Sequence, residues 1–414
     1  MNLFVLSWSY IKERPLNTFL NVFLLSLGLA IMIVLLLMSH QLKNNLEKNA
    51  KRIDLVVGAK GSPLQLILSS IYHIDFPTGN IPLVEARKIA GNRRQVKNAI
   101  PLALGDSYKS YRIVGTNYSY LDLYQAEIDN GVVWSGDFEV TLGSETAIGL
   151  GLNVGDEFVG EHGLTSGGQS HDEHAYQVVG ILKPTGTVID RLIMSNVESV
   201  WLMHEKEGDS DHHEHDSTTA VADIFGIKTD DPDDKELTSI LIQYRGPRAA
   251  IQFPRMVNSN SSLQAASPPF ETARLFSLVG VGVDVLRGFA YVIIFVAGLS
   301  VFIALYNSLK ERRYDLAIMR SMGASPSKLL VMVILEGVII TILGGLMGMF
   351  LGHGLVELSG QLMATSNQTF ITGILFLPEE ILVGLVSIVL GIFASIIPAI
   401  EAYKTDISQV LAKG

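Results

Sequence analysis

The sequence predicts an α-helical membrane protein with four transmembrane helices and a large extracytoplasmic α+β domain inserted between helices 1 and 2. Two observations lead to this fold class. Of the 414 residues, 48% are hydrophobic and only 17% are charged, which indicates a membrane protein with a substantial soluble part. Four apolar segments are long enough to cross a bilayer, and no such segment lies in the long interval between the first two.

The N-terminal part is predicted to form a short helix, a membrane span and a stalk. Residues 1–16 contain aromatic and basic side chains that suit a helix at the membrane interface, and Pro15 separates them from the next segment. Residues 17–38 carry no charge and form the first span, in which Ser26 and Ala30 favour the close approach of another helix. The polar segment that follows, to residue 53, is interpreted as the same helix leaving the membrane as a stalk.

Residues 54–279 are predicted to form the extracytoplasmic α+β domain. The net charge of −10 is concentrated here and argues against a nucleic acid partner. Residues 255–272 are polar and include two consecutive prolines, so they are interpreted as a hinge or loop that leads back to the membrane. Short elements are expected in this domain: strands at 99–104, 111–116, 178–182 and 188–193, of which the last two are paired, and helices at 82–91 and 145–150.

Residues 280–414 are predicted to hold the remaining three spans, at 286–309, 329–351 and 378–400. The connection 308–328 contains five Lys and Arg residues, whereas residues 352–380 contain none. The positive-inside rule therefore places the first connection in the cytoplasm and the second outside, together with the inserted domain.

The third span combines small residues with one carboxylate. Gly344, Gly348 and Gly352 recur at four-residue spacing, which predicts close helix packing. Glu336 is costly inside a membrane unless it is paired or hydrated. We expect a structural ion pair with an arginine of the basic connection, and a proton relay is the alternative.

The basic connection is predicted to contain an amphipathic coupling helix over residues 310–323. Gly323 stands where a helix needs a left-handed C-terminal cap, and Ser325 and Pro326 suit the N-cap and first position of the next helix. The apolar residues that recur at helical spacing are Tyr314, Ala317, Ile318 and Met322.

The run ERRYDLAIMRSMGA, from Glu311 to Ala324, resembles the corresponding loop of the MacB/FtsX/LolC permease family, whose pattern is roughly E-R-R-x-E-I-G-I-L-R-A-L-G-A. Asp315 stands where that family has Glu, and Ala317 where it has Gly. The order of one span, a large outer domain and three spans is also similar to the family. The resemblance implies that this helix docks on an ATPase through the residues Glu311, Arg312, Arg313, Asp315, Arg320, Gly323 and Ala324.

The resemblance further implies the permease subunit of an ATP-driven ABC transporter in the bacterial cytoplasmic membrane. No P-loop is recognised in the sequence, so ATP is expected to be hydrolysed by a separate subunit, and the chain itself is not expected to be an enzyme. The outer domain would act on a lipoprotein, lipid, peptide or small molecule for export. A second copy or a related permease is expected as partner. The alternatives are an FtsX-like signalling subunit that controls a periplasmic protein and a zinc-linked transport component.

The zinc alternative rests on histidines in the inserted domain. Seven of the ten histidines fall between His162 and His215, and the chain has no cysteine. Imidazole and carboxylate are the remaining zinc ligands, although a solvated acidic loop explains the pattern equally well. The candidate ligands are His171, His174, His212, His213 and His215.

The predicted topology is tested by single cysteines introduced as Ser170→Cys and Ser325→Cys. An impermeant thiol reagent applied to intact cells should label the first and not the second, because only residue 170 lies outside. The reverse labelling pattern would contradict the topology.

Overall fold

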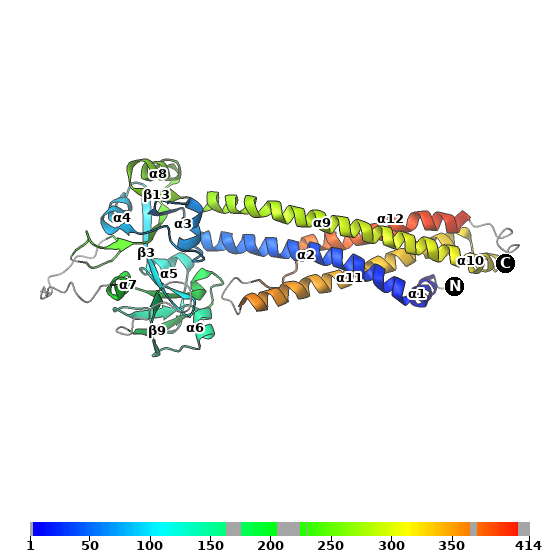
Figure 1. Cartoon of the computed structure of the whole chain (residues 1–414), viewed down its shortest axis with the longest axis horizontal. Helices are drawn as coiled ribbons and strands as arrows, with labels where there is room; N and C mark the ends of the chain where they lie inside the picture. The colour runs from blue at the N-terminus through cyan, green and yellow to red at the C-terminus, as the bar shows by residue number, and fades with distance from the viewer. Residues whose placement is uncertain (1–2, 163–174, 205–223, 230, 365–370, 405–414) are drawn as a thin grey trace. The chain divides into compact units, whose positions relative to one another are not determined.

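The computed structural model describes residues 3–162, 175–204, 224–229, 231–364 and 371–404 (Figure 1). The chain divides into two compact units. Met1–Leu42 and Leu278–Gly414 form the first, called the membrane unit here, and Lys43–Ser277 forms the second, called the outer unit.

Four helices among the described residues are long and apolar enough to cross a membrane, as predicted. A short helix precedes the first of them and ends before Pro15, which begins the next helix, so the predicted break at this proline is confirmed. The first long helix continues to Ala50, so the polar segment after the predicted span is helical up to that residue. The helices are α1 (Leu3–Glu13), α2 (Pro15–Ala50), α9 (Pro268–Glu311), α10 (Arg313–Ser321), α11 (Pro326–Ala364) and α12 (Pro378–Lys404).

Helix α11 packs on α2 through the three glycines at four-residue spacing. A Cβ atom added at Gly344, Gly348 or Gly352 would lie 2.8 Å from a side-chain atom of α2. The facing residues are Leu25, Leu29 and Ile33, together with the backbone of Ser26 and Ala30. The two helices therefore approach closely at these small residues.

A second face of α11 packs on α12. An added Cβ at Gly337 would lie 2.9 Å from the Cβ of Ser395 and 3.0 Å from the carbonyl oxygen of Gly391. Gly345 similarly faces Ser387 of α12. Because both faces lack bulky side chains, the backbones approach closely without any hydrophobic driving force between the helices.

The outer unit is built on a mixed sheet of eleven described strands, in the order β13-β1-β12-β3-β4-β10-β6-β9-β5, with β7 on β9 and β8 on β3. The strands are β1 (Leu55–Ala59), β3 (Val96–Tyr108), β4 (Tyr111–Gly115), β5 (Ile128–Gly131), β6 (Glu139–Leu142), β7 (Glu157–Phe158), β8 (Glu161–His162), β9 (Tyr176–Leu182), β10 (Leu192–Ser195), β12 (Ser239–Tyr244) and β13 (Leu263–Ala266); β2 (Ile81–Pro82) pairs with β11 (Glu236–Leu237). The helices are α3 (Pro63–Ser70), α4 (Leu83–Ala90), α5 (Ser119–Tyr124), α6 (Ser144–Leu150), α7 (Val197–His204) and α8 (Pro247–Asn260).

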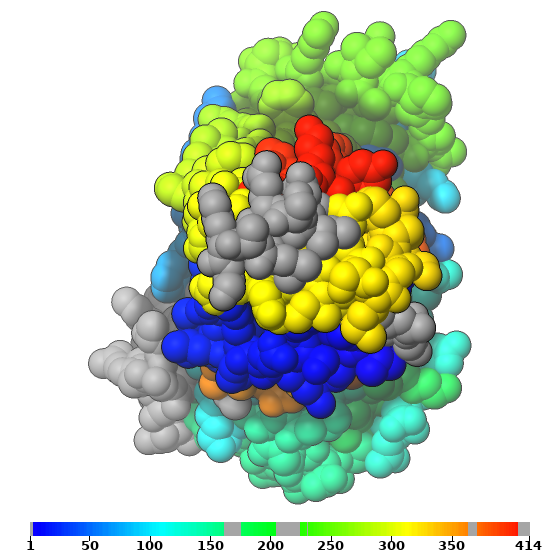
Figure 2. Space-filling model, turned by 90° about the vertical axis from the view of Figure 1, so that its right-hand side faces the viewer, coloured from blue at the N-terminus to red at the C-terminus, as the bar shows by residue number. Residues whose placement is uncertain are grey.

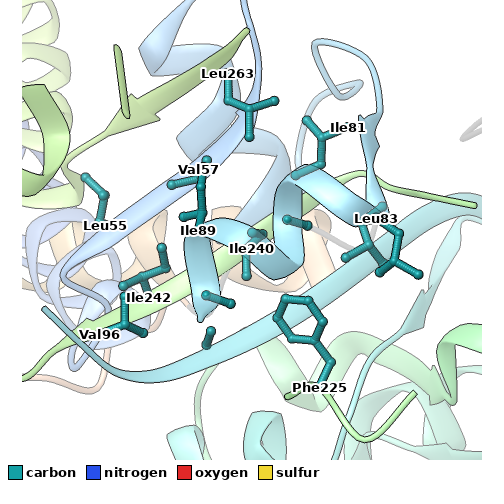
Figure 3. Close-up of a cluster of buried hydrophobic side chains, with 14 of the residues drawn as sticks. Leu55, Val57, Ile81, Leu83, Ile89, Val96, Phe225, Ile240, Ile242 and Leu263 are labelled. Atoms are coloured by element: carbon teal, nitrogen blue, oxygen red, sulfur yellow. The ribbon is translucent and has the colours of Figure 1, made fainter. Parts of the chain in front are cut away.

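Two hydrophobic cores stabilise this unit. The first lies among β1, β3, β12, α4 and α8, and Figure 3 shows part of it, with Val57 of β1 and Ile89 of α4 close to Ile240 of β12. The second lies around β4, β6, β9 and β10 and includes the fully buried Tyr176. Strand β3 contributes Val96 and Ala103 to the first core and borders the second through Tyr108, so this long strand joins the two.

One predicted strand pair is wrong. Residues 188–191 form a 3-10 turn, and the following strand β10 pairs with β4 and β6 rather than with β9. The cause is the buried Asp190, whose carboxylate accepts hydrogen bonds from the backbone N–H groups of Thr185 and Gly186 at 2.6–2.9 Å. These bonds close a compact turn and direct β10 away from β9.

The loop predicted at residues 255–272 is also wrong. Residues up to Asn260 belong to α8, and β13 follows as the edge strand on β1. The two prolines open α9, where they occupy first-turn positions that need no backbone N–H. Polar composition here marks an exposed helix face rather than a loop.

The glycine face of α11 generates a stability prediction. Gly348→Val should destabilise the membrane unit by about 1–3 kcal/mol, because the added methyl groups must displace Leu29 and the backbone of Ser26. The measurement is the thermal unfolding of the purified full-length protein in detergent. Gly354→Val is the matched control, since an added Cβ at Gly354 meets nothing within 4 Å. Equal effects of the two variants would refute the packing role.

Candidate functional site

The candidate site is the connection between α9 and α11, which contains α10. Gly323 has a φ of +97°, a left-handed conformation that favours glycine. Its N–H donates to the carbonyl of Arg320, and the N–H of Ala324 donates to the carbonyl of Met319, both at 3.0 Å. These two bonds form a Schellman motif. The predicted left-handed cap is confirmed, and α11 begins at Pro326 as expected.

Arg312, the single residue between α9 and α10, points into the membrane unit. Its Nη2 atom lies 3.2 Å from Oε1 of Glu336, and both side chains are about nine-tenths buried. The same guanidinium contacts the hydroxyl of Ser308 and lies 4.1 Å from the ring centroid of Tyr10. The ion pair expected between Glu336 and an arginine of the connection is therefore present.

This geometry gives Arg312 an intramolecular partner. The sequence pattern placed it with the charged residues that contact a partner, but only 9% of its surface is exposed. The reason is the cost of leaving the Glu336 carboxylate unpaired among apolar side chains, which an inward arginine offsets. Arg312 thus holds α10 in place from the inside.

Helix α1 supports α10 from the side. Leu3, Leu6 and Tyr10 pack against a cluster that includes Leu316 of α10 and Val333 of α11. Figure 2 shows α1, in blue, lying beside α10, in yellow. This support was missed from the sequence, where α1 had been assigned only to the membrane interface.

Two polar contacts secure α1 to its neighbours. The hydroxyl of the buried Ser7 donates to the carbonyl of Met332 at 3.2 Å. Arg14 forms an ion pair with Glu311, the last residue of α9. Glu311 therefore has an intramolecular partner, although its side chain is 62% exposed.

An apolar stripe runs along the outward side of α10 and ends at Met322, the residue that caps the helix. Tyr314, Ile318 and Met322 recur every four residues and are 51%, 37% and 82% exposed. The expected apolar face is thus divided, because only Leu316 and Ala317 are buried.

The charged residues of α10 lie beside this apolar stripe. Asp315 is exposed and Arg320 is half-buried. Arg313 is about half exposed, and its Nη2 lies 2.5 Å from Oε1 of Glu401 on α12. Ala324 is half-buried and Gly323 exposed. A partner docking here would meet the Tyr314–Met322 stripe first and these charges at its margin.

A second polar cluster, not predicted from the sequence, joins α11 to the segment before α12. His353 Nδ1 lies 2.5 Å from the carbonyl of Gly373, and Nε2 lies 2.8 Å from the carboxylate of Glu380. The carbonyl of Gly373 can only accept, so Nδ1–H of His353 is the donor in the first of these bonds. Glu357 accepts from the N–H of Gly373 at 2.8 Å, and Gln41 of α2 exchanges two bonds with Thr372. The cluster fastens this segment to two helices.

The histidine clusters lie outside the described residues, namely His171, His174, His212, His213 and His215. Within the described ranges, no group of three or more His, Asp or Glu side chains could hold a metal ion. The zinc hypothesis therefore stays a prediction.

Two family models match the chain. The model described as MacB-like periplasmic core domain matches residues 18–242, and the model described as FtsX-like permease C-terminal matches residues 287–407. Among curated proteins, an uncharacterized ABC transporter permease, YknZ of Bacillus subtilis, is 25% identical over 165 residues, which cover 38% of this chain and 39% of that protein. The chain thus aligns with well under half the length of this relative.

Two solved structures are similar to part of the chain. The periplasmic region of MacB from Actinobacillus actinomycetemcomitans is 10% identical, with 56% of this chain and 95% of that chain covered and a TM-score of 0.33. The extracellular domain of the noncanonic ABC-type transporter YknZ from Gram-positive bacteria is 14% identical, with 52% and 99% covered and a TM-score of 0.29.

The buried ion pair generates a prediction for a double-mutant cycle. Arg312→Gln should destabilise the protein by about 3–5 kcal/mol, because it leaves the Glu336 carboxylate buried and unpaired. Adding Glu336→Gln should recover much of this loss, because the charge is then removed. Arg313→Gln is the control, and as half of a partly exposed pair it should cost at most about 1 kcal/mol. Thermal unfolding of the purified protein is measured for Arg312→Gln, Glu336→Gln, the double variant and the control, and strictly additive effects of the two single substitutions would contradict the pair.

Proposed function

Because the chain belongs to the ABC transporter permeases with a MacB-like periplasmic core domain and an FtsX-like C-terminal permease domain, we propose that it is the membrane subunit of a complex whose ATP is hydrolysed by a separate ATPase subunit. Helix α10 docks on that ATPase and acts as the coupling helix. The observation that carries this proposal is the division of α10 into an anchored inner face and an exposed outer face. The inner face is fixed by Arg312 and Glu336, and the outer face presents Tyr314, Ile318 and Met322.

The proposed docking contact is apolar at its centre and charged at its margin. Met322 is 82% exposed, and an exposed apolar stripe on a short amphipathic helix is suited to a groove on a partner. Asp315, Arg313 and Arg320 would then fix orientation and select the partner rather than supply most of the affinity. Gly323 preserves the direction of the exit into α11.

Motion of α10 would pass to the outer unit through the long helices and act on a substrate outside the membrane. The spans support this, since the described helices carry few ionisable side chains for a hydrophilic path and Glu336 is already paired with Arg312. We place the complex in the bacterial cytoplasmic membrane, with a lipoprotein, lipid, peptide or small molecule as exported substrate. A second copy or a related permease completes it, because four spans are few for a transporter bundle.

The docking proposal is tested with the double variant Ile318→Ser/Met322→Ser. It should weaken the binding of the cognate ATPase, measured with purified proteins, by about tenfold or more, because a fully buried apolar side chain contributes about 1.5–3 kcal/mol. Tyr403→Ser is the control, since Tyr403 is also exposed but lies on the last turn of α12 outside the stripe. Unchanged affinity in the double variant would refute docking through this face.

A second experiment separates docking from a purely topological role of the basic connection. Exchanging Met319 and Arg320 keeps the number of charges and moves one of them around the helix. We expect the permease to lose its influence on ATPase turnover while it still inserts into the membrane. Full activity of the exchange variant would indicate that the basic connection only fixes the membrane topology.

A further inference from the structure

The outer unit contains a basic cleft at the end of α2. Its volume is about 380 Å³, which is in the range of sites for small ligands. Three segments form its walls: the last turn of α2, the end of α5, and the turn after β9. The lining residues that carry charge are Lys48, Lys51, Arg52, Lys183 and Glu127.

The positive charge of the cleft exceeds its internal compensation. Four cations and one carboxylate leave three formal positive charges, in a chain whose net charge is −10. Lys183 pairs with Glu127 at 2.9 Å, which lowers the pKa of that carboxyl. Lys51 and Arg52 are exposed, and neither side chain forms a hydrogen bond or ion pair with another residue of the described ranges.

The walls of the cleft are fixed by hydrogen bonds before any ligand arrives. Lys48 Nζ donates to the carbonyls of Thr185 and Gly186 at 2.9 and 3.0 Å, which ties α2 to the turn after β9. The side chain of Asn49 accepts from the N–H of Val188 at 2.8 Å. Such preorganisation reduces the entropy lost when a ligand binds.

Arg52 occupies a backbone position that disfavours it. Its φ is +72°, and it is the second residue after α2, a position where glycine is the usual residue. Its carbonyl accepts from Nε2 of Gln243 at 3.0 Å, which holds the conformation. An arginine at this position directs a planar, multidentate donor to the edge of the cleft.

From these observations we propose that the cleft binds the phosphate group of a phosphate ester, with Lys51 and Arg52 as its principal ligands. Arginine forms bidentate bonds to phosphate and lysine adds a point charge. Thr187 is buried in the wall, while the outward cations remain accessible. The phosphate could be carried by a phospholipid headgroup or by a soluble ester, since both present the same chemistry.

The test uses the full-length protein and two probes. Glycerol 3-phosphate is titrated against the protein in nonionic detergent, and nanodiscs of phosphatidylcholine with or without phosphatidylglycerol present the lipid. Hydrogen exchange of residues 48–52 and 183–187 reports binding in both arms. Protection in nanodiscs of either composition, without protection by glycerol 3-phosphate, assigns a lipid headgroup, and protection by glycerol 3-phosphate assigns a phosphate ester in general.

Variants decide whether the cations themselves bind. Lys51→Gln/Arg52→Gln should weaken binding by about tenfold or more, whereas Arg94→Gln/Lys97→Gln removes the same charge from exposed positions outside the cleft and should not. Arg52→Gly should keep or raise the melting temperature, because it relieves the left-handed strain, and should still bind more weakly. No protection by either probe, or protection that survives in Lys51→Gln/Arg52→Gln, overturns the proposal. No ATPase is involved, so failure here leaves the proposed function untouched.

Discussion

A carboxylate inside an apolar helix has to be paired, and much of the geometry of the membrane unit follows from this requirement. Glu336 satisfies this requirement by forming an ion pair with Arg312, the residue between α9 and α10. Because the pair is buried, removing either partner is far more costly than an exposed ion pair would suggest. The junction between the two helices is therefore fixed, and α10 has one orientation with Tyr314 outward and Leu316 inward.

Close helix packing provides the second fixed element of the membrane unit. Helix α11 meets α2 through Gly344, Gly348 and Gly352, and meets α12 through Gly337 and Gly345. Between lipid-exposed helices there is no hydrophobic drive, so close van der Waals contact must supply the stability. Since Glu336 lies on the same helix as these glycines, the packed core and the anchor of α10 belong to one continuous element.

Local signals carried most of what could be predicted from the sequence. The lengths of the apolar segments predicted the four spans, and the four-residue spacing of glycines predicted the glycine face of α11. The position of Gly323, directly after apolar residues at helical spacing, predicted its left-handed cap. Contacts between distant segments could not be predicted in the same way. The turn closed by Asp190 reverses an expected strand pairing, and the contact of Tyr10 with Arg312 depends on where α1 packs. Arg312 shows the difference well, because the sequence predicted that an arginine of the connection pairs with Glu336 but not which arginine it is.

The proposed coupling also depends on how α2 ends. The last turn of a helix has carbonyl groups without intrahelical partners, and a free end of this kind would bend or fray under load. In the outer unit, the buried Tyr124 donates its hydroxyl to the carbonyl of Asn49 at 3.2 Å, and Tyr72 donates to the carbonyl of Leu46 at 3.1 Å. The side-chain oxygen of Asn49 also accepts a hydrogen bond from the N–H of Val188. These bonds fasten the end of α2 to separate segments of the outer unit, so its last turn is held by side chains of that unit.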